Sequence, residues 1–283
     1  MSLLRCRGAC ATHQGRRPSN QDSVISLRLP DGREIIAVAD GMGGAAVGEI
    51  ASGWALEVLT RELRAGAGLK SAVQAANGAV HAAGRENPAY GGMGTTLVAL
   101  LRTGATYEIA NVGDSRAYYL DASTMRQLTL DHSFVAEAVR AGGLSHEEAS
   151  RSPWRNVVTR ILGTKAEVEV DLFGPFEIGL QPHAILMCSD GLYKGLADPV
   201  IHQHLLSAED AQAAVGKLSS FAFLGGSTDN ITVAVMEFGS FFRSCDVPTL
   251  PFDGPAHRGD SHPQPARASG RVPFHATGGT HVH

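Results

Sequence analysis

Four aspartates stand where apolar segments of the sequence end or begin. Asp40 follows "IIAVA", Asp190 follows "AILMCS", and Asp229 precedes "NITVAV". Asp114 lies in "ANVGDSR", between two further strand-like runs. A single aspartate at a strand end is usually a turn former, but several carboxylates at one sheet edge would repel one another unless cations neutralised them. Oxygen ligands without nearby Cys or His pairs select Mg²⁺ or Mn²⁺ rather than zinc.

The residues next to these acids could provide space and positive charge. Glycines follow Asp40 in "DGMGG", and Gly41 lets its own backbone carbonyl approach a cation with no Cβ in the way. Anion recognition would come from arginine, whose planar fork can hold a phosphate bidentately, and "GRRPSNQD" supplies Arg16 and Arg17. An arginine pair in a loop is otherwise a solvated surface patch. The strand would deliver the carboxylate, and the glycines would clear space for metal, water and substrate.

The hydrophobic pattern predicts the elements that must position these residues. Helical spacing predicts helices over 47–63 and 69–85, with further helices near 133–141 and 198–222. Strand-like runs fall at 34–39, 95–101, 106–112, 115–120, 168–173, 184–188 and 230–238. Short turns join the strands between 94 and 128, which implies antiparallel pairing. Two helices, a block of strands and two more helices indicate an α+β architecture of sheets covered by helices.

Length, composition and charge limit the class of protein. The chain has 283 residues, of which 43% are hydrophobic, and a formal net charge of -4, so it can bury a sizeable core and lacks the basic stripe of a nucleic-acid-binding protein. Four cysteines in this length do not indicate a disulfide framework, which favours a reducing cytoplasm. The N-terminus lacks a signal-peptide h-region, and no apolar run is long enough to span a membrane.

The composition changes near residue 240, where a segment rich in Pro, Gly, His and Ser begins. Such a segment cannot bury enough apolar surface to offset the entropy of ordering it. We therefore expect residues 1–239 to form the folded domain and residues 240–283 to form a disordered tail.

Eight short motifs, each weak alone, occur in an order that gives the sequence a family resemblance. They are "RPSNQD" (17–22), "ADGMGG" (39–44), "GMGTTLVAL" (92–100), "NVGDSRAY" (111–118), "LTLDHS" (128–133), "VVTRILG" (157–163), "CSDGLY" (188–193) and "STDNITV" (227–233). From about residue 8 to 238 the chain resembles the metal-dependent type 2C serine/threonine protein phosphatases, the PPM family, in its bacterial form. The resemblance implies two packed antiparallel β-sheets flanked by helix pairs, an α-β-β-α sandwich, with a two-metal site at one end.

Carried over position by position, the resemblance assigns a metal-binding role to most of the acids. Asp40 would bridge two Mn²⁺ or Mg²⁺ ions, and the Gly41 carbonyl would bind one of them. Asp190 and Asp229 would hold the other ion, and Asp22 would work mainly through metal-bound water.

The resemblance also implies a reaction and its partners. Asp114 matches the position linked to a third, weaker ion, and Arg17 would bind the substrate phosphate. A hydroxide bridging the two ions would attack phosphoserine or phosphothreonine in line, without a phosphoenzyme, with Arg17, Asp40, Asp190 and Asp229 as the catalytic set. The implied partners are phosphorylated proteins and a cognate serine/threonine kinase, and the expected protein is a cytoplasmic monomer without nucleic-acid or membrane partners.

Two positions depart from the family pattern. Gln21 stands where the pattern often has glutamate, so one negative charge near the second ion is missing. Met42 stands where many eukaryotic members have a histidine thought to act as general acid, so the leaving group's proton must come from elsewhere, with metal-bound water and His132 as candidates. Residues 140–156 fall where the family has a flap, and their Gly-Gly pair is consistent with a mobile lid or a simple surface loop.

Three other interpretations compete with this one. Cys10 and Arg16 have the C-x₅-R spacing of cysteine-dependent phosphatases, but a reactive thiolate there needs a helix N-terminus after it, and "RRPSN" offers none. The histidines of "HQH" (202–204) would diverge on a helix. A catalytically weak regulator that binds phosphoproteins is the alternative from another class, and the intact metal-binding acids argue against it.

Overall fold

The computed structural model describes residues 6–43 and 47–244. They belong to the first of the two compact units into which the chain divides, Met1–Val247. The tail predicted over 240–283 therefore lies outside the described residues, apart from residues 240–244.

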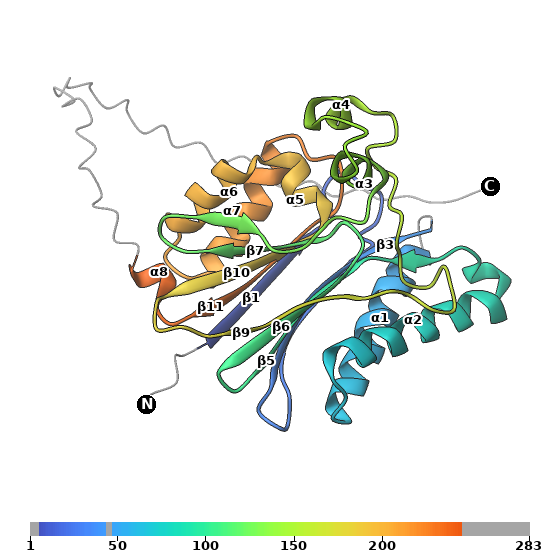
Figure 1. Ribbon diagram of the computed structural model, residues 1–283, viewed down its shortest axis with the longest axis horizontal. Coiled ribbons are helices and arrows are strands. Elements are labelled where there is room, and N and C mark those ends of the chain that lie inside the picture. The colour runs from blue at the N-terminus through green and yellow to red at the C-terminus, as the bar shows by residue number, and fades with distance from the viewer. Residues whose placement is uncertain (1–5, 44–46, 245–283) are drawn as a thin grey trace, which may run out of the picture. The chain divides into compact units, whose positions relative to one another are not determined.

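Two β-sheets form the centre of this unit (Figure 1). Their strands are β1 (Cys6–His13), β2 (Asp22–Arg28), β3 (Glu34–Met42), β4 (Gly94–Thr95), β5 (Leu97–Thr103), β6 (Thr106–Val112), β7 (Arg116–Leu120), β8 (Met125–Gln127), β9 (Asp171–Glu177), β10 (His183–Cys188) and β11 (Ile231–Phe238). One sheet has the order β1-β11-β10-β7-β8, and the other has the order β2-β3-β5-β6-β9, with β4 paired to β3. The pairings between these strands are antiparallel.

Helices cover the outer face of each sheet (Figure 1). The six-stranded sheet is covered by α1 (Val47–Arg64) and α2 (Leu69–Glu86). The five-stranded sheet is covered by α5 (Asp190–Gly195), α6 (Asp198–Leu206) and α7 (Ala211–Leu224). The other helices are short: η1 (Pro88–Tyr90), α3 (Phe134–Arg140), α4 (His146–Arg151) and α8 (Phe241–Ser244). This arrangement confirms the predicted α+β fold of two antiparallel sheets flanked by helices, and no helix in the described part of the chain is long and apolar enough to cross a membrane.

Strand β3 shows how the sequence builds the layers. Ile35 and Ala37 lie in the core beneath α1 and α2, whereas Ile36 and Val38 lie in the core between the two sheets. Successive side chains of a strand point to opposite faces, so a strand covered on both faces needs a continuous apolar run. Each of the larger side chains contributes about 1.5–3 kcal/mol by its burial. The run "IIAVA" thus places its last residue, and the acid after it, at the end of a rigid strand.

The structure differs from the predicted elements at several places, and the short elements β8, α4, α5 and α8 are among those not predicted. Strands β1 and β2 were not predicted, because each lies at the edge of its sheet and carries polar residues that interrupt the pattern. The helix predicted over 198–222 is two helices, because Asp210 caps the second one through a bond from the Ala213 amide (2.7 Å). The strand predicted over 168–173 is β9, which begins only at Asp171.

The predicted boundary between residues 239 and 240 falls one residue before α8, and this yields a test. Phe241 and Phe242 are 1% and 4% exposed and lie in the core of the five-stranded sheet. Ending the chain at Ser240 removes both rings, which contribute about 1.5–3 kcal/mol each, so calorimetry should show a Tm lower by about 10 °C. A chain ending at Val247 keeps α8 and should keep the Tm of the full chain. Equal losses in the two shortened chains would show that the segment beyond 247 packs against the domain.

Candidate active site

Antiparallel topology gathers five aspartates at one end of the two sheets. Asp22, the first residue of β2, pairs with Asp40 near the end of β3. Asp190 follows β10 and Asp229 precedes β11, and these two strands are antiparallel neighbours, so the two acids adjoin. Asp114 lies where the chain crosses from β6 in one sheet to β7 in the other. Residues far apart in the sequence thus meet at one edge of the fold.

A cavity of about 410 Å³ lies among these residues. Of the residues predicted for the site, it is lined by Arg17, Asp40, Gly41, Asp114, Asp190 and Asp229. Asp22 is outside the lining, because its carboxylate is buried against the five-stranded sheet, where Ser189 Oγ donates a hydrogen bond to Asp22 Oδ2 (2.7 Å). The structure therefore brings the predicted residues together, and their roles as ligands stay predictions.

Two threonines fix the backbone of Asp40. Thr95 Oγ1 and the Thr96 amide both donate to the Asp40 carbonyl oxygen at 2.9 Å, and the Asp40 amide donates to Thr96 Oγ1 at 3.0 Å. These bonds explain the pair of threonines in "GMGTTLVAL". They orient the carboxylate of Asp40 without engaging it.

Gly41 is required by a close approach of the backbone. A Cβ on Gly41 would lie 2.0 Å from the carbonyl oxygen of Gly48 in α1 and 2.6 Å from that of Gln21. No side chain fits there, so glycine lets the helix begin directly against the strand. The predicted approach of its carbonyl to a cation is compatible with this packing.

Asn230 positions the loop that carries Arg17. Its Nδ2 donates to the carbonyl oxygens of Gln14 (2.7 Å) and Ser19 (2.9 Å), and its Oδ1 accepts from the Gln21 amide (2.9 Å). Asn230 was not singled out from the sequence. The available signal was its position directly after the acid in "STDN". An amide side chain there can donate and accept hydrogen bonds at once.

Burial raises the pKa of four carboxyl groups in this cluster. The pKa of Asp22 and that of Asp114 rise to about 7, because burial disfavours the charged form and neighbouring aspartates repel it. The pKa of Asp40 and that of Asp190 are also raised, again chiefly by burial, with repulsion from neighbouring aspartates added. A divalent cation among these carboxylates would offset both effects.

Two carboxylate oxygens at this end of the fold have unmet bonding capacity. Asp22 Oδ1 and Asp190 Oδ1 are buried and have no hydrogen-bond partner among the described residues. A buried polar atom without a partner costs about 1–3 kcal/mol, and more when it is charged. Hard divalent cations take oxygen ligands of this kind. The donor set therefore fits Mg²⁺ or Mn²⁺.

Two basic side chains already engage part of this charge. Arg17 Nη2 lies 2.8 Å from Asp229 Oδ2, and the Lys194 ammonium pairs with Asp190 Oδ2 one helical turn away. In this arrangement no three His, Cys, Asp or Glu side chains of the described part converge as a ready-made metal cluster. An ion on the free oxygen of Asp190 would compete with Lys194 for the charge of that carboxylate. Lys194 was missed from the sequence, although its i, i+4 spacing from Asp190 in a helix was a usable signal.

The structure removes His132 from the candidates for general acid. Its side chain is buried, its Nδ1 accepts a bond from the Gly113 amide (3.0 Å), and its Nε2 lies 3.1 Å from Asp171 Oδ2. Burial lowers the pKa of His132. The ring does not line the cavity, so it braces the chain crossing before Asp114 and is not placed to protonate a leaving group.

The alternative sites suggested by spacing are not formed. Cys10 lies inside β1, and burial raises the pKa of its thiol, which is the opposite of what a cysteine nucleophile needs. His202 Nε2 lies 3.1 Å from the carbonyl oxygen of Asp121, whereas His204 stacks on Phe221 with 4.1 Å between ring centroids. The two histidines therefore serve separate contacts.

An α-β-β-α sandwich with an aspartate-lined cavity at one end defines a class of metal-dependent phosphatases, and comparison with known proteins agrees. Residues 9–219 match the family model described as protein phosphatase 2C. Serine/threonine phosphatase stp of Listeria welshimeri is 36% identical over 242 residues, covering 80% of this chain and 93% of that protein. PstP of Mycobacterium tuberculosis is 37% identical over 227 residues, covering 78% of this chain and 42% of that protein. The chain belongs to the protein phosphatase 2C family.

Solved structures show the same likeness. A crystal structure of the Mycobacterium tuberculosis phosphatase PstP/Ppp superposes with a TM-score of 0.72 at 33% identity, covering 83% of this chain and 99% of that one. The catalytic domain of PstP in complex with two manganese ions superposes with a TM-score of 0.71 at 31% identity, covering 84% of this chain and 100% of that one.

The Lys194–Asp190 pair yields a test of the metal centre. Because the ammonium offsets part of the negative charge of Asp190, whose other oxygen is free for an ion, Lys194→Ala should strengthen Mn²⁺ binding on the order of 10-fold, a modest effect for a partly exposed pair. Isothermal titration calorimetry measures it. Lys194→Arg keeps the charge and should keep the affinity of the unchanged protein. Equal Mn²⁺ affinities in the alanine variant and the unchanged protein would show that the lysine does not compete with the ion.

Proposed function

We propose that this protein hydrolyses phosphoserine and phosphothreonine on proteins with the help of two Mn²⁺ or Mg²⁺ ions at the aspartate-lined cavity. The observation that carries the proposal is the pair of buried, unpartnered carboxylate oxygens, Asp22 Oδ1 and Asp190 Oδ1, at the same end of the fold as the anion-binding candidate Arg17. The family and the activities named for its relatives support the same function.

The proposed ligands come from both sheets. Asp40 would bridge the two ions and the Gly41 carbonyl would bind one of them, while Asp190 and Asp229 would hold the other. Asp22, behind them, would act mainly through water, and its unpartnered oxygen supports this role. When bound, two such ions supply a water nucleophile at neutral pH and neutralise charge on the phosphoryl group.

Residues of the chain itself would bind the substrate and hold it in place. Arg17 is 54% exposed at its side chain, so its guanidinium can leave Asp229 and take two phosphoryl oxygens. Asn230 keeps the backbone of that loop fixed while the side chain moves. Asp114 is the candidate ligand of a third ion, and it shares its part of the cavity with Lys194.

The proposal extends to partners and place in the cell. Phosphorylated proteins would be the substrates, and a serine/threonine kinase would supply them, so that the two enzymes oppose each other in signalling. We also propose a monomeric, cytoplasmic protein whose catalytic domain ends with α8. Among the described cysteines, Cys10 and Cys188 are free thiols, which supports a reducing compartment.

Removal of a metal-binding charge tests the proposal directly. Asp190→Asn and Asp229→Asn should each lower metal-dependent hydrolysis of p-nitrophenyl phosphate at least about 100-fold, because ions at this site depend on anionic ligands. Asp31→Asn, at an exposed turn, is the matched control and should keep full activity. Turnover near that of the unchanged protein in saturating Mn²⁺ would contradict the assignment. An unchanged protein that binds phosphoproteins but hydrolyses nothing would favour the catalytically weak regulator.

Arg17 and its neighbour Arg16 separate phosphate binding from metal binding. Arg17→Ala should lower kcat/KM by about 10- to 150-fold, mostly through KM, because a charge-assisted contact to the phosphate contributes roughly 1.5–3 kcal/mol. Mn²⁺ affinity should not weaken, since the substitution only frees Asp229. Arg17→Lys should restore part of the activity.

Arg16 is the matched control. It lies over the Phe223 ring, 5.6 Å from its centroid, and outside the cavity, so Arg16→Ala should lower kcat/KM only slightly. The reverse ranking of these two variants would show that the wrong arginine has been assigned.

A further inference from the structure

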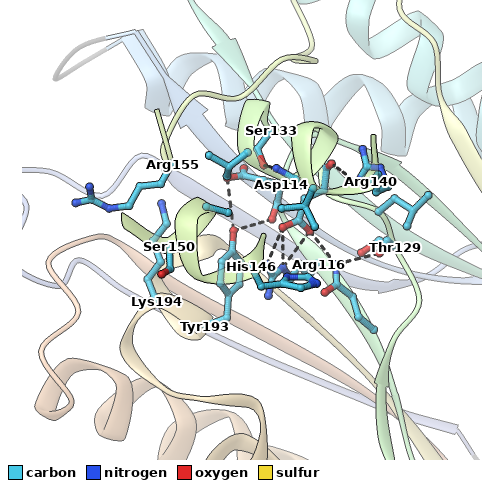
Figure 2. Close-up of a pocket in the computed structure, with 17 residues that line it drawn as sticks. Asp114, Arg116, Thr129, Ser133, Arg140, His146, Ser150, Arg155, Tyr193 and Lys194 are labelled. Atoms are coloured by element: carbon cyan, nitrogen blue, oxygen red, sulfur yellow. Dashed lines mark hydrogen bonds and ion pairs between the residues drawn. The ribbon is translucent and has the colours of Figure 1, made fainter. Parts of the chain in front are cut away.

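A second cavity, of about 450 Å³, adjoins the first and shares Asp114 and Lys194 with it. Figure 2 shows the residues that line this second cavity. We call it the flap pocket, because residues 133–156, which comprise α3, α4 and the segment predicted as a flap, form one side of it, and we call these residues together the flap. Its other side is made by β7, by residues 127–131 and by α5. The proposed hydrolysis at the first cavity does not use this space.

The side of the flap pocket nearest the sheets is rigid and tied to the acid cluster. Arg116 binds Asp131 through two nitrogens, with Nε 3.0 Å from Oδ1 and Nη2 2.7 Å from Oδ2. The same guanidinium stacks over the Tyr193 ring at 3.7 Å, and the Tyr193 hydroxyl donates to the Asp114 carbonyl oxygen at 3.0 Å. Arg116 is therefore fully engaged and holds this wall in place (Figure 2).

The flap side of the pocket presents arginines without acidic partners. Arg140 donates only to the carbonyl oxygen of Asp131 (3.1 Å), and Arg155 only to that of Ser152 (3.4 Å), among the described residues. Both side chains line the pocket, and in the view of Figure 2 they stand at its opposite ends. Each guanidinium thus keeps donors free for a ligand.

The acids of the flap are committed elsewhere. Glu148 closes the capping box at the start of α4 by accepting from the Ser145 amide (2.8 Å), and Glu147 pairs with Arg151 (2.9 Å). Glu137 accepts a bond from Thr159 Oγ1 (2.6 Å). None of the three glutamates lines the flap pocket. Its charged lining consists of Arg116, Arg140, Arg155 and Lys194 against Asp114 and Asp131, and this excess of positive charge favours an anion.

We propose that the flap pocket binds a second anionic side chain of the substrate, a carboxylate or a second phosphate, a few residues from the phosphorylated residue at the metal centre. This inference rests on the proposed function, because it names a feature of the same phosphoprotein substrate. The two cavities share a wall, so one extended peptide advancing about 3.3 Å per residue reaches both. Apolar side chains of Leu130, Val135 and Val139 line the pocket as well and suit the stem of such a residue.

Three phosphothreonine peptides of equal length test the proposal. One has neutral flanks, one has flanking aspartates, and one carries a non-hydrolysable phosphonate analogue of phosphoserine nearby. The full protein with Mn²⁺ should show a kcat/KM about 10-fold higher for each anionic peptide than for the neutral one, mainly through KM, because arginine forms charge-assisted bonds to either anion. A larger gain for the phosphonate than for the aspartates would assign the pocket to a second phosphate, and the opposite ranking would assign it to a carboxylate.

Substitutions in the flap test whether the preference for anionic peptides arises from the flap pocket. The measured quantity is kcat/KM for an anionic peptide divided by kcat/KM for the neutral peptide. In Arg155→Ala this ratio should fall towards 1, and in Arg155→Glu it should fall below 1. Arg140→Ala should lower the ratio as well. A ratio taken within one variant cancels any general change in activity. Arg151 is the matched control, since it lies on the same flap, pairs with Glu147 and does not line the pocket, so Arg151→Ala should keep the original ratio.

The outcomes distinguish failure of this inference from failure of the proposed function. Equal kcat/KM for the three peptides, or a ratio that survives Arg155→Glu, overturns the flap pocket and leaves the phosphatase assignment standing. Hydrolysis of p-nitrophenyl phosphate without hydrolysis of any phosphopeptide overturns the proposed protein substrate, and the inference falls with it.

Discussion

Repulsion among buried carboxylates is the constraint on which the rest of this site depends. Five aspartates meet at one end of the sandwich, and burial there raises the pKa of Asp22 and of Asp114 to about 7. Among the described residues that line the cavity, only Arg17 and Lys194 provide positive charge, one to each of two acids. Two oxygens of the cluster still have no partner in the part of the chain that the structure describes. The fold thus creates an excess of negative charge that divalent cations are suited to neutralise.

The cluster of mutually repelling carboxylates is stable only because hydrophobic packing and backbone hydrogen bonds elsewhere compensate for the repulsion. Apolar side chains fill one core between the sheets and one beneath each helical layer, and this burial offsets local repulsion at the edge. Around the acids, polar residues fix the backbone instead of neutralising charge, as Thr95 and Thr96 do for Asp40. Ser189 is an exception, because its hydroxyl binds a carboxylate oxygen of Asp22, and the Tyr193 hydroxyl is another, because it lies 3.5 Å from Asp114 Oδ2. The acids are therefore oriented while much of their bonding capacity stays open.

The sequence reveals local features of this fold well and contacts across the fold poorly. The helices at 47–63 and 69–85 and the buried strands were predictable, because their apolar spacing repeats over many residues. Edge strands β1 and β2 escaped notice because only part of each strand is covered. The acids were found through their positions after apolar runs and through the family motifs. Contacts such as Asn230 with Gln14, 216 residues apart, leave no local pattern, and neither do the free guanidinium groups of the flap.

Lys194 links the two cavities, and its position makes their charges interdependent. It pairs with Asp190 in the acid cluster and also lines the flap pocket. An ion on the free oxygen of Asp190 would repel the ammonium, and the flap pocket is an adjoining space that the lysine already borders. Displacement in that direction would add positive charge to the pocket and strengthen its attraction for an anionic side chain. Because such coupling is reciprocal in free energy, an anion in the flap pocket would in turn favour ion binding, so that a doubly anionic substrate would help to assemble the metal centre that hydrolyses it.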